Sequence, residues 1–251
     1  MIDHHVHLEK GDYTLDFVMP FINKAKENDI TEIYFVEHTH AFLEFSFLYD
    51  EVRAYSKAQE DWYQKKKKKN LMEYFSFINY LRGLNLGIEI KIGLEICYSS
   101  MHEEELRIEL KKYPFDFLIG SVHFVFGYGI DLQYEEYPFL DKLYKEYFKE
   151  ERKLIQSRLF TIIGHPDLIR IIPCDYPLID EYINLAILAR ENKIMVEHNS
   201  GNWRYHMNHL GLDLDFIKIL KANDVKIVLS SDAHEAQYVG YHFQEMMLEL
   251  K

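Results

Sequence analysis

Residues 1–40 have the sequence MIDHHVHLEKGDYTLDFVMPFINKAKENDITEIYFVEHTH, and this stretch contains the unit that decides the fold. Two short apolar segments, Ile2 to His7 and Ile33 to Val36, have the length and composition of β-strands. Between them, Leu15 to Asn28 has a helical pattern that stops at Asn28-Asp29. The stretch therefore predicts a β-α-β unit in which histidines and carboxylates follow the strands.

The same alternation continues to the end of the chain. Five further strands are expected, at Ile88 to Ile96, Phe117 to Val122, Phe160 to Gly164, Ile194 to Glu197 and Val225 to Ser230. Helical patterns lie between strands, at Glu103 to Lys112, Pro138 to Arg158, Leu178 to Asn192 and Asp213 to Asn223. Seven alternating units predict an α/β fold with a parallel sheet covered by helices. A distorted (βα)7 barrel is favoured over an open sheet, because a barrel gathers the residues that follow its strands at one face.

The chain is expected to form one domain over residues 1–251, since a single barrel of about this length is ordinary. The connection over residues 42–86 is too long for a normal crossover. We expect it to be a helical insertion with two helices, which could cap the site, bind a partner or cover the barrel end. It contains five consecutive lysines, Lys65 to Lys69, interpreted mainly as a solvated surface and alternatively as a patch that attracts anions.

Charge and composition exclude several classes of protein. The formal net charge is −12, which makes nucleic acid an unlikely partner, because duplex binding depends on neutralising phosphates. No signal peptide is expected at the N-terminus, and no apolar segment approaches the roughly 20 residues of a membrane span. Cys97 and Cys174 are isolated, which favours a reduced, cytoplasmic protein. The sequence does not indicate an oligomeric state.

Histidines and carboxylates follow almost every predicted strand at its carboxyl end. In His5-Val6-His7 the two imidazoles lie on one side of a strand, because alternate side chains share a face. The other members of the set are Glu37-His38, Glu95, Ser121-Val122-His123, Gly164-His165-Pro166-Asp167 and Ser231-Asp232-Ala233-His234. Imidazole and carboxylate ligands together suit Zn²⁺, Mn²⁺ or Fe²⁺. The pattern predicts a multinuclear metal site at the carboxyl ends of the strands.

These motifs, together with Glu197-His198-Asn199-Ser200-Gly201, closely resemble those of the PHP (polymerase and histidinol phosphatase) superfamily. More narrowly, they are similar to its histidinol-phosphate phosphatase branch. The resemblance extends from residue 3 to residue 234, with the motifs in the family's order. It implies a distorted (βα)7 barrel with a trinuclear metal centre, which agrees with the seven strands expected from the alternation.

Carried over position by position, the resemblance implies a set of metal ligands for two to three divalent ions (Zn, Mn or Fe). His5, His7, Glu95 and Asp232 would hold the first metal. Glu95 would bridge to a second, which His123 and His165 also hold. His38 and His234 would hold the third. Relatives often supply a further histidine after the HxH motif, where this chain has Glu9; Glu9 could replace it, with Asp12 a weaker candidate and an exposed glutamate as the alternative.

The activity implied by the resemblance is hydrolysis of a small phosphomonoester, with L-histidinol phosphate favoured. Two metals about 3.5–4 Å apart would activate a bridging water for in-line attack. Glu95, Asp232 and His234 are the candidate catalytic residues, and Asp232 or a nearby histidine would orient the water or move its proton. The general acid is not assigned.

Candidate substrate-binding residues are Arg204, Arg170, Asn199 and His40. Arg204 follows the Asn199-Ser200-Gly201 turn, where histidinol-phosphate phosphatases carry a phosphate-binding arginine, and Arg170 is the second candidate. Arginine suits bidentate contacts with phosphate. His4 and His198 are out of phase with the ligands and are expected to point away from them.

Two alternative functions remain. One is a PHP phosphodiesterase or exonuclease acting on nucleotides or nucleic acid ends, which the acidic charge disfavours. The other is a non-catalytic metal-binding regulatory protein, which the complete ligand set disfavours.

Overall fold

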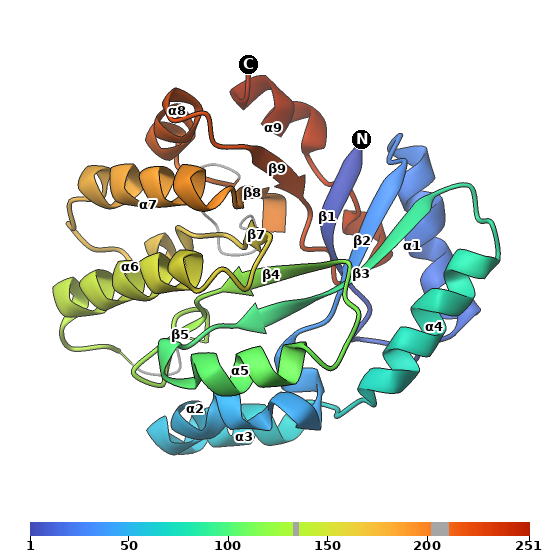
Figure 1. The fold of residues 1–251 in the computed structure, drawn as a ribbon, viewed down its shortest axis with the longest axis horizontal. Helices are drawn as coiled ribbons and strands as arrows, with labels where there is room; N and C mark the ends of the chain where they lie inside the picture. Colours follow the sequence, from blue (N-terminus) through green and yellow to red (C-terminus); the bar gives the residue numbers. More distant parts are fainter. Residues whose placement is uncertain (133–135, 202–210) are drawn as a thin grey trace.

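Seven parallel strands form a nearly closed barrel in the computed structural model, which describes residues 1–132, 136–201 and 211–251. In barrel order they are β1 (Ile2–His7), β2 (Glu32–Val36), β3 (Glu89–Cys97), β4 (Phe117–Ser121), β7 (Ile162–Ile163), β8 (Met195–Asn199) and β9 (Ile227–Ser230). The first and last strands meet through a bridge between Val6 and Ala233, where the His7 backbone N–H donates to the Ala233 carbonyl at 2.8 Å. Figure 1 shows β1 and β9 side by side. The predicted fold class is confirmed.

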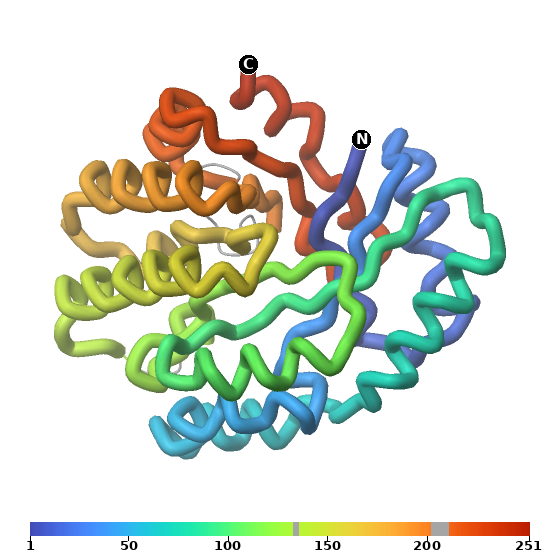
Figure 2. The backbone as a smooth tube through the Cα atoms, in the orientation of Figure 1, coloured from blue at the N-terminus to red at the C-terminus, as the bar shows by residue number. Residues whose placement is uncertain are grey.

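Helices surround the strands, and the chain winds around the barrel in sequence order (Figure 2). They are α1 (Leu15–Glu27), α4 (Leu71–Gly83), α5 (Glu103–Leu110), α6 (Leu140–Ser157), α7 (Ile179–Asn192), α8 (Leu214–Ala222) and α9 (Phe243–Glu249). Each packs with an apolar face; in α6, for example, Leu143, Tyr147 and Leu154 are fully buried. Thr14 caps α1, its hydroxyl accepting from the Phe17 backbone N–H at 3.3 Å. No helix in the described ranges is both long and apolar enough to cross a membrane.

The segment between β2 and β3 differs from the expectation of two helices. It holds three α-helices, α2 (Asp50–Tyr55), α3 (Lys57–Lys65) and α4, preceded by two 3₁₀ segments, Thr39–Ala41 and Leu43–Tyr49. Ser56 separates α2 from α3, because its backbone is extended and its hydroxyl accepts from the Gln59 N–H as an N-cap. The two helices lie below the carboxyl ends of β3 and β4 in the view of Figure 1.

A short antiparallel hairpin follows β4 and was not predicted from the sequence. It is formed by β5 (Phe124–Val125) and β6 (Tyr128–Gly129). The fifth barrel strand is shorter than predicted, since only Ile162 and Ile163 pair with their neighbours. Gly164 follows this strand where the backbone approaches β4 closely. A Cβ on Gly164 would lie 2.2 Å from the Ser121 Oγ and 2.9 Å from Ile119, so only glycine fits before His165.

Candidate metal centre

The carboxyl ends of the strands bring the expected ligands together. His5 and His7 project from β1 on the same face, with ring centroids 4.7 Å apart. Glu95 projects from β3, and the remaining members follow β2, β4, β7 and β9 directly: His38, His123, His165, Asp232 and His234. Parallel strands end at the same barrel face, which is why residues from six separate segments converge.

Glu95 lies at the centre of this group and is 1% exposed. Its Oε2 is 2.9 Å from the His38 Nε2, 3.2 Å from the His5 Nε2 and 3.4 Å from the His7 Nε2. Its Oε1 is 2.9 Å from the His165 Nε2 and 3.3 Å from the His123 Nε2. One buried carboxylate is thus surrounded by five imidazoles.

These side chains fit divalent metal ions. Three groups have ligand atoms within 4.8 Å of one another, namely His5, His7 and Asp232; His38, Glu95 and His123; and His7, Glu9, His38 and His234. Ligands about 2.0–2.2 Å from a zinc ion lie at most about 4.4 Å apart, so side-chain shifts of a few tenths of an ångström would let the atoms of each group share an ion. Although three ring nitrogens surround the Glu95 Oε2, it accepts no well-aligned hydrogen bond from any described residue, as expected for atoms that share a cation rather than a proton.

Without metal, protons occupy part of the cluster. Burial opposes protonation of His5, but the carboxylates of Glu197, Glu95 and Asp232 outweigh it and raise the pKa of His5 well above its usual value. Burial, with His234 and His38 nearby, lowers the pKa of His7 to about 4, so this imidazole is neutral and free to bind metal. Bound cations would replace the protons, since metal ligands must be deprotonated.

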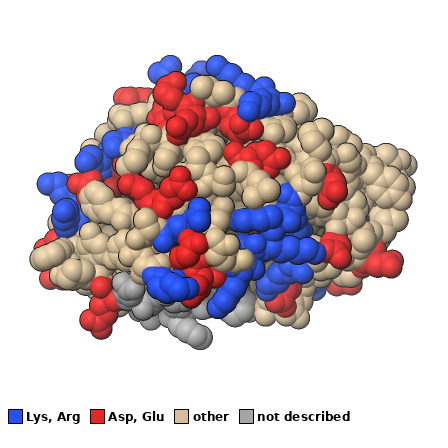
Figure 3. Space-filling model, turned by 90° about the horizontal axis from the view of Figure 1, so that it is seen from below, with Lys and Arg blue, Asp and Glu red and all other residues tan. Residues whose placement is uncertain are grey.

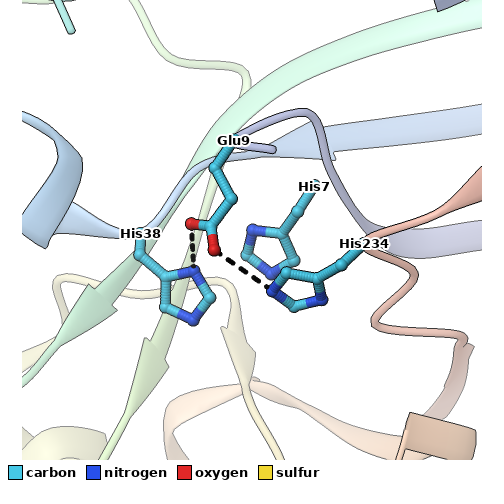
Figure 4. A group of neighbouring side chains, drawn as sticks. All are labelled: His7, Glu9, His38 and His234. Carbon is cyan, nitrogen blue, oxygen red and sulfur yellow. Dashed lines mark hydrogen bonds and ion pairs between the residues drawn. The ribbon is translucent and has the colours of Figure 1, made fainter. Parts of the chain in front are cut away.

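Glu9 takes part in the cluster instead of being exposed at the strand exit. Its Oε2 is 2.9 Å from the His38 Nδ1 and its Oε1 is 3.5 Å from the His234 Nε2 (Figure 4). Burial opposes ionisation of Glu9, yet the facing His38 holds the pKa of the carboxyl well below its usual range. The geometry therefore supports the hypothesis that Glu9 replaces a histidine ligand, whereas Asp12 pairs with Lys67 away from the cluster.

Lys69 holds the loop that carries Glu9. Its Nζ donates to the backbone carbonyls of Leu8 at 3.1 Å and Gly11 at 2.7 Å, on either side of Glu9. The Leu8 backbone N–H donates to the Glu37 Oε1 at 3.1 Å, which fixes the same loop from the barrel side. This lysine and Glu37 were not recognised as positioning residues from sequence, because their contacts depend on how the segment between β2 and β3 folds back.

We expect Lys69→Met to weaken metal binding at the group that contains Glu9 by about 10- to 100-fold, the usual cost of losing a partner that positions a ligand. Competition with a chromophoric chelator would measure the affinity. Lys67→Met is the matched control, because the Lys67 side chain is 67% exposed and pairs only with Asp12 among described residues. Equal affinities in the two variants would contradict the positioning role.

Glu197 orients the ligands from behind and is a third positioning residue that was not recognised from the sequence. Its Oε1 is 2.7 Å from the His5 Nδ1, and its Oε2 accepts from the His165 backbone N–H at 2.8 Å. Carboxylates that bind the distal nitrogen of a ligating histidine fix its orientation and raise its basicity. The available signal was period-two alternation on β8, which places Glu197 on the same face as Asn199.

The candidate catalytic residues Asp232 and His234 face an open cavity of about 440 Å³. The cavity is lined by ligand candidates and by residues of the β2–β3 segment, including His40 as predicted. Asp232 and His165 have positive φ values of 51° and 27°. A non-glycine residue in this region costs about 1–3 kcal/mol, and such strain is concentrated at functional sites.

Unlike His40, the other expected substrate-binding residues whose positions are described do not line the cavity. Arg170 is outside the cavity lining, because its guanidinium contacts Asp167 at 2.6 Å and Asp213 at 3.5 Å. Asn199 is buried, and its Nδ2 donates to the Glu197 Oε2 at 3.0 Å, so it positions the cluster instead of lining the cavity. A phosphate contact by either residue is not supported by this geometry. Arg204 lies outside the described residues.

His4 and His198 point away from the cluster, as the alternation predicted. The His4 Nδ1 is 3.0 Å from the Leu229 carbonyl, and its ring packs against Tyr34. The His198 Nδ1 accepts from the Leu212 N–H, and its Nε2 is 3.1 Å from Glu249 of α9. Both histidines therefore join parts of the barrel wall.

Comparison with known proteins agrees with the fold and the cluster. The model of the PHP domain matches residues 3–201. The chain belongs to the PHP domain family. The expected family membership is confirmed, and two curated relatives similar to this PHP chain are named as histidinol phosphatases.

A protein of Deinococcus radiodurans described as a probable histidinol-phosphatase is 27% identical over 203 residues, 76% of each chain. Histidinol-phosphatase of Bacillus subtilis is 25% identical over 184 residues, 64% of this chain and 69% of that one. In structure, this PHP chain is similar to histidinol phosphate phosphatase of Lactococcus lactis, with a TM-score of 0.73 and 19% identity over 99% of this chain and 92% of the other. That protein was crystallised with zinc, L-histidinol and phosphate.

Proposed function

We propose that this PHP protein is a metal-dependent phosphomonoesterase whose substrate is a small phosphorylated metabolite, most specifically L-histidinol phosphate. The main support for the proposal is the buried Glu95 carboxylate, which lies within 3.4 Å of five imidazoles. A cavity large enough for a small metabolite lies beside this cluster. The names of the curated relatives support the choice of substrate.

Two to three divalent ions, Zn, Mn or Fe, are proposed for the cluster. His5, His7, Asp232 and Glu95 would hold one, and Glu95 with His123, His165 and His38 a second. Glu9 and His234, with His38 and His7 beside them, would hold a third. Bound there, such ions activate water and neutralise the charge on the phosphoryl oxygens.

The chain's own residues would orient this chemistry. Asp232 lines the cavity, and its Oδ1 is 3.4 Å from the His234 Nδ1, so the carboxylate is placed to take a proton from an attacking water. His234 also lines the cavity and is placed to pass a proton onward. Glu197 keeps the His5 ring fixed through its Nδ1. Positioning of this kind supplies most of the catalysis in phosphoryl transfer.

The remaining lining suits the leaving group of L-histidinol phosphate, which carries an amine and an imidazole. Asp131 supplies a carboxylate for a cationic amine, whereas Glu235 is paired with Lys10. Trp62, Phe124 and Tyr49 supply aromatic surface against which a planar ring can pack. Aromatic stacking and charge pairing together favour this substrate over a phosphomonoester whose aryl leaving group is uncharged.

Steady-state kinetics would test the proposal. We expect the metal-loaded protein to hydrolyse L-histidinol phosphate with a kcat/KM at least about 100-fold above that for 4-nitrophenyl phosphate, because one buried charge pair and one ring contact contribute roughly 3 kcal/mol. Preference for a bis-aryl phosphodiester or single-stranded DNA would favour the phosphodiesterase instead. Absence of turnover with full metal occupancy would favour a non-catalytic metal-binding protein.

A further inference from the structure

The segment between β2 and β3 supplies a wall of the substrate cavity. Its residues His40, Tyr49, Trp62 and Lys66 all line the cavity. Basic side chains gather on the face of the molecule that carries α2 and α3 (Figure 3), and Lys66 to Lys69 directly follow α3 in the chain. Within this otherwise acidic chain, the insertion brings positive charge to the mouth of the metal cluster.

A series of ring contacts links His38 of the cluster to Lys66. The His38 and His40 rings are stacked, with centroids 4.8 Å apart and an interplanar angle of 7°. Trp62 meets the edge of His40 at 5.4 Å and an angle of 81°. The Lys66 Nζ lies 5.0 Å from the Trp62 ring centroid. The Trp62 ring thus holds the ammonium group by a cation–π contact on the cavity side of α3.

Lys66 differs from the three lysines that follow it in having no acceptor among the described residues. Lys67 pairs with Asp12, Lys68 donates to the His40 carbonyl, and Lys69 donates to Leu8 and Gly11. No described residue accepts a hydrogen bond from Lys66 or forms an ion pair with it. Lys65 is exposed and does not line the cavity. Of the run, only Lys66 both reaches the cavity and keeps its donors available.

A phosphate dianion in this cavity would be stabilised by a cationic side chain, because most of the charged side chains that line the cavity are carboxylates. Its described lining holds four carboxylates, Glu9, Asp131, Asp232 and Glu235, and two lysines. The other lysine, Lys10, is held by Glu235 at 2.7 Å. Arg170, the second candidate for a phosphate-binding arginine, is engaged by two aspartates. Besides the proposed metal ions, a phosphomonoester dianion entering beside these carboxylates therefore meets one uncommitted side-chain cation on the described wall.

We propose that Lys66, positioned by Trp62, binds the phosphoryl oxygens of the substrate. This inference rests on the proposed phosphomonoesterase function and gives the insertion a role in it. An ammonium group donates charge-assisted hydrogen bonds to phosphate oxygens as a point charge. Because the insertion carries both residues, the length and sequence of this segment determine how tightly the cavity binds an anion.

Substitution of Lys66 tests the proposal. Lys66→Gln is expected to raise KM for the phosphomonoester by about 10- to 150-fold, the loss that corresponds to one charge-assisted hydrogen bond, and to weaken binding of inorganic phosphate by a similar factor. Trp62→Leu is expected to have a smaller effect in the same direction. The kcat value and the metal content should stay near those of the unaltered protein, because the cluster is untouched. Lys66→Arg should restore most of the binding.

Lys65→Gln is the matched control, since it removes the same charge from the adjacent residue outside the cavity. Isothermal titration of the metal-loaded protein with inorganic phosphate gives a readout that does not require turnover. If Lys66→Gln and Lys65→Gln bind phosphate equally, or if the unaltered protein binds none, the inference is wrong. If phosphate binding depends on Lys66 but no phosphomonoester is hydrolysed, the inference stands and the proposed function fails.

Discussion

Glu95→Gln is expected to lower kcat/KM for phosphomonoester hydrolysis by more than about 100-fold, beyond the cost of losing a residue that merely orients a ligand. The neutral amide cannot balance cations held between His5, His38 and His123, and its NH₂ group would face ring nitrogens. Steady-state kinetics and elemental analysis of the same sample would show loss of both activity and metal. The fold should persist, because the substitution preserves volume in a packed interior.

Glu151→Gln provides a matched control at an equally buried carboxyl. Glu151 is fully buried in α6, and burial raises the pKa of its carboxyl well above the usual value, so the side chain is already neutral. Replacing a neutral acid by an amide outside the cluster should leave activity close to that of the unaltered protein. Unchanged activity and metal content in Glu95→Gln would contradict the assignment of Glu95.

Removing the metals is expected to abolish activity and lower Tm. Metal at about 100 times its Kd contributes roughly 2.7 kcal/mol to the folded state. In a chain of this size that contribution corresponds to a decrease in Tm of about 5–11 °C. Calorimetry before and after treatment with a strong chelator would measure the shift, and reloading with Zn²⁺, Mn²⁺ or Fe²⁺ should restore both properties.

The stability effect has a local cause. In the metal-free cluster, His5 and His38 must pair as cations with Glu95, whereas burial disfavours every one of these charges. Full activity in protein shown by elemental analysis to contain no metal would overturn the metal dependence. An unchanged Tm with complete loss of activity would instead show that the cluster folds independently of its ions.

The convergence of the cluster was predictable from the chain because it depends on two local regularities. Period-two alternation puts His5 and His7 on the inner face of β1 and turns His4 outward. Parallel strands then bring residues such as Glu95 and His165 to one face of the barrel, however far apart they are in the chain. These rules do not depend on the loops.

The residues that surround the cluster were less predictable. Lys69 acts on the Glu9 loop across 61 positions of sequence, and only the path of the β2–β3 segment brings them together. Arg170 has the charge expected of a phosphate ligand, but Asp213 approaches it from a distant part of the chain and engages it. Such pairings follow from tertiary packing, which residue spacing does not encode.

Histidines and carboxylates from the strand ends are proposed to form one multinuclear metal centre. An anomalous difference map from crystals of the metal-loaded protein tests it most directly. We expect at least two peaks next to Glu95, one among His5, His7 and Asp232 and one toward His123 and His165, with a third beside Glu9. No peak within about 3 Å of the Glu95 carboxylate, longer than any of the metal–ligand bonds expected there, would contradict it.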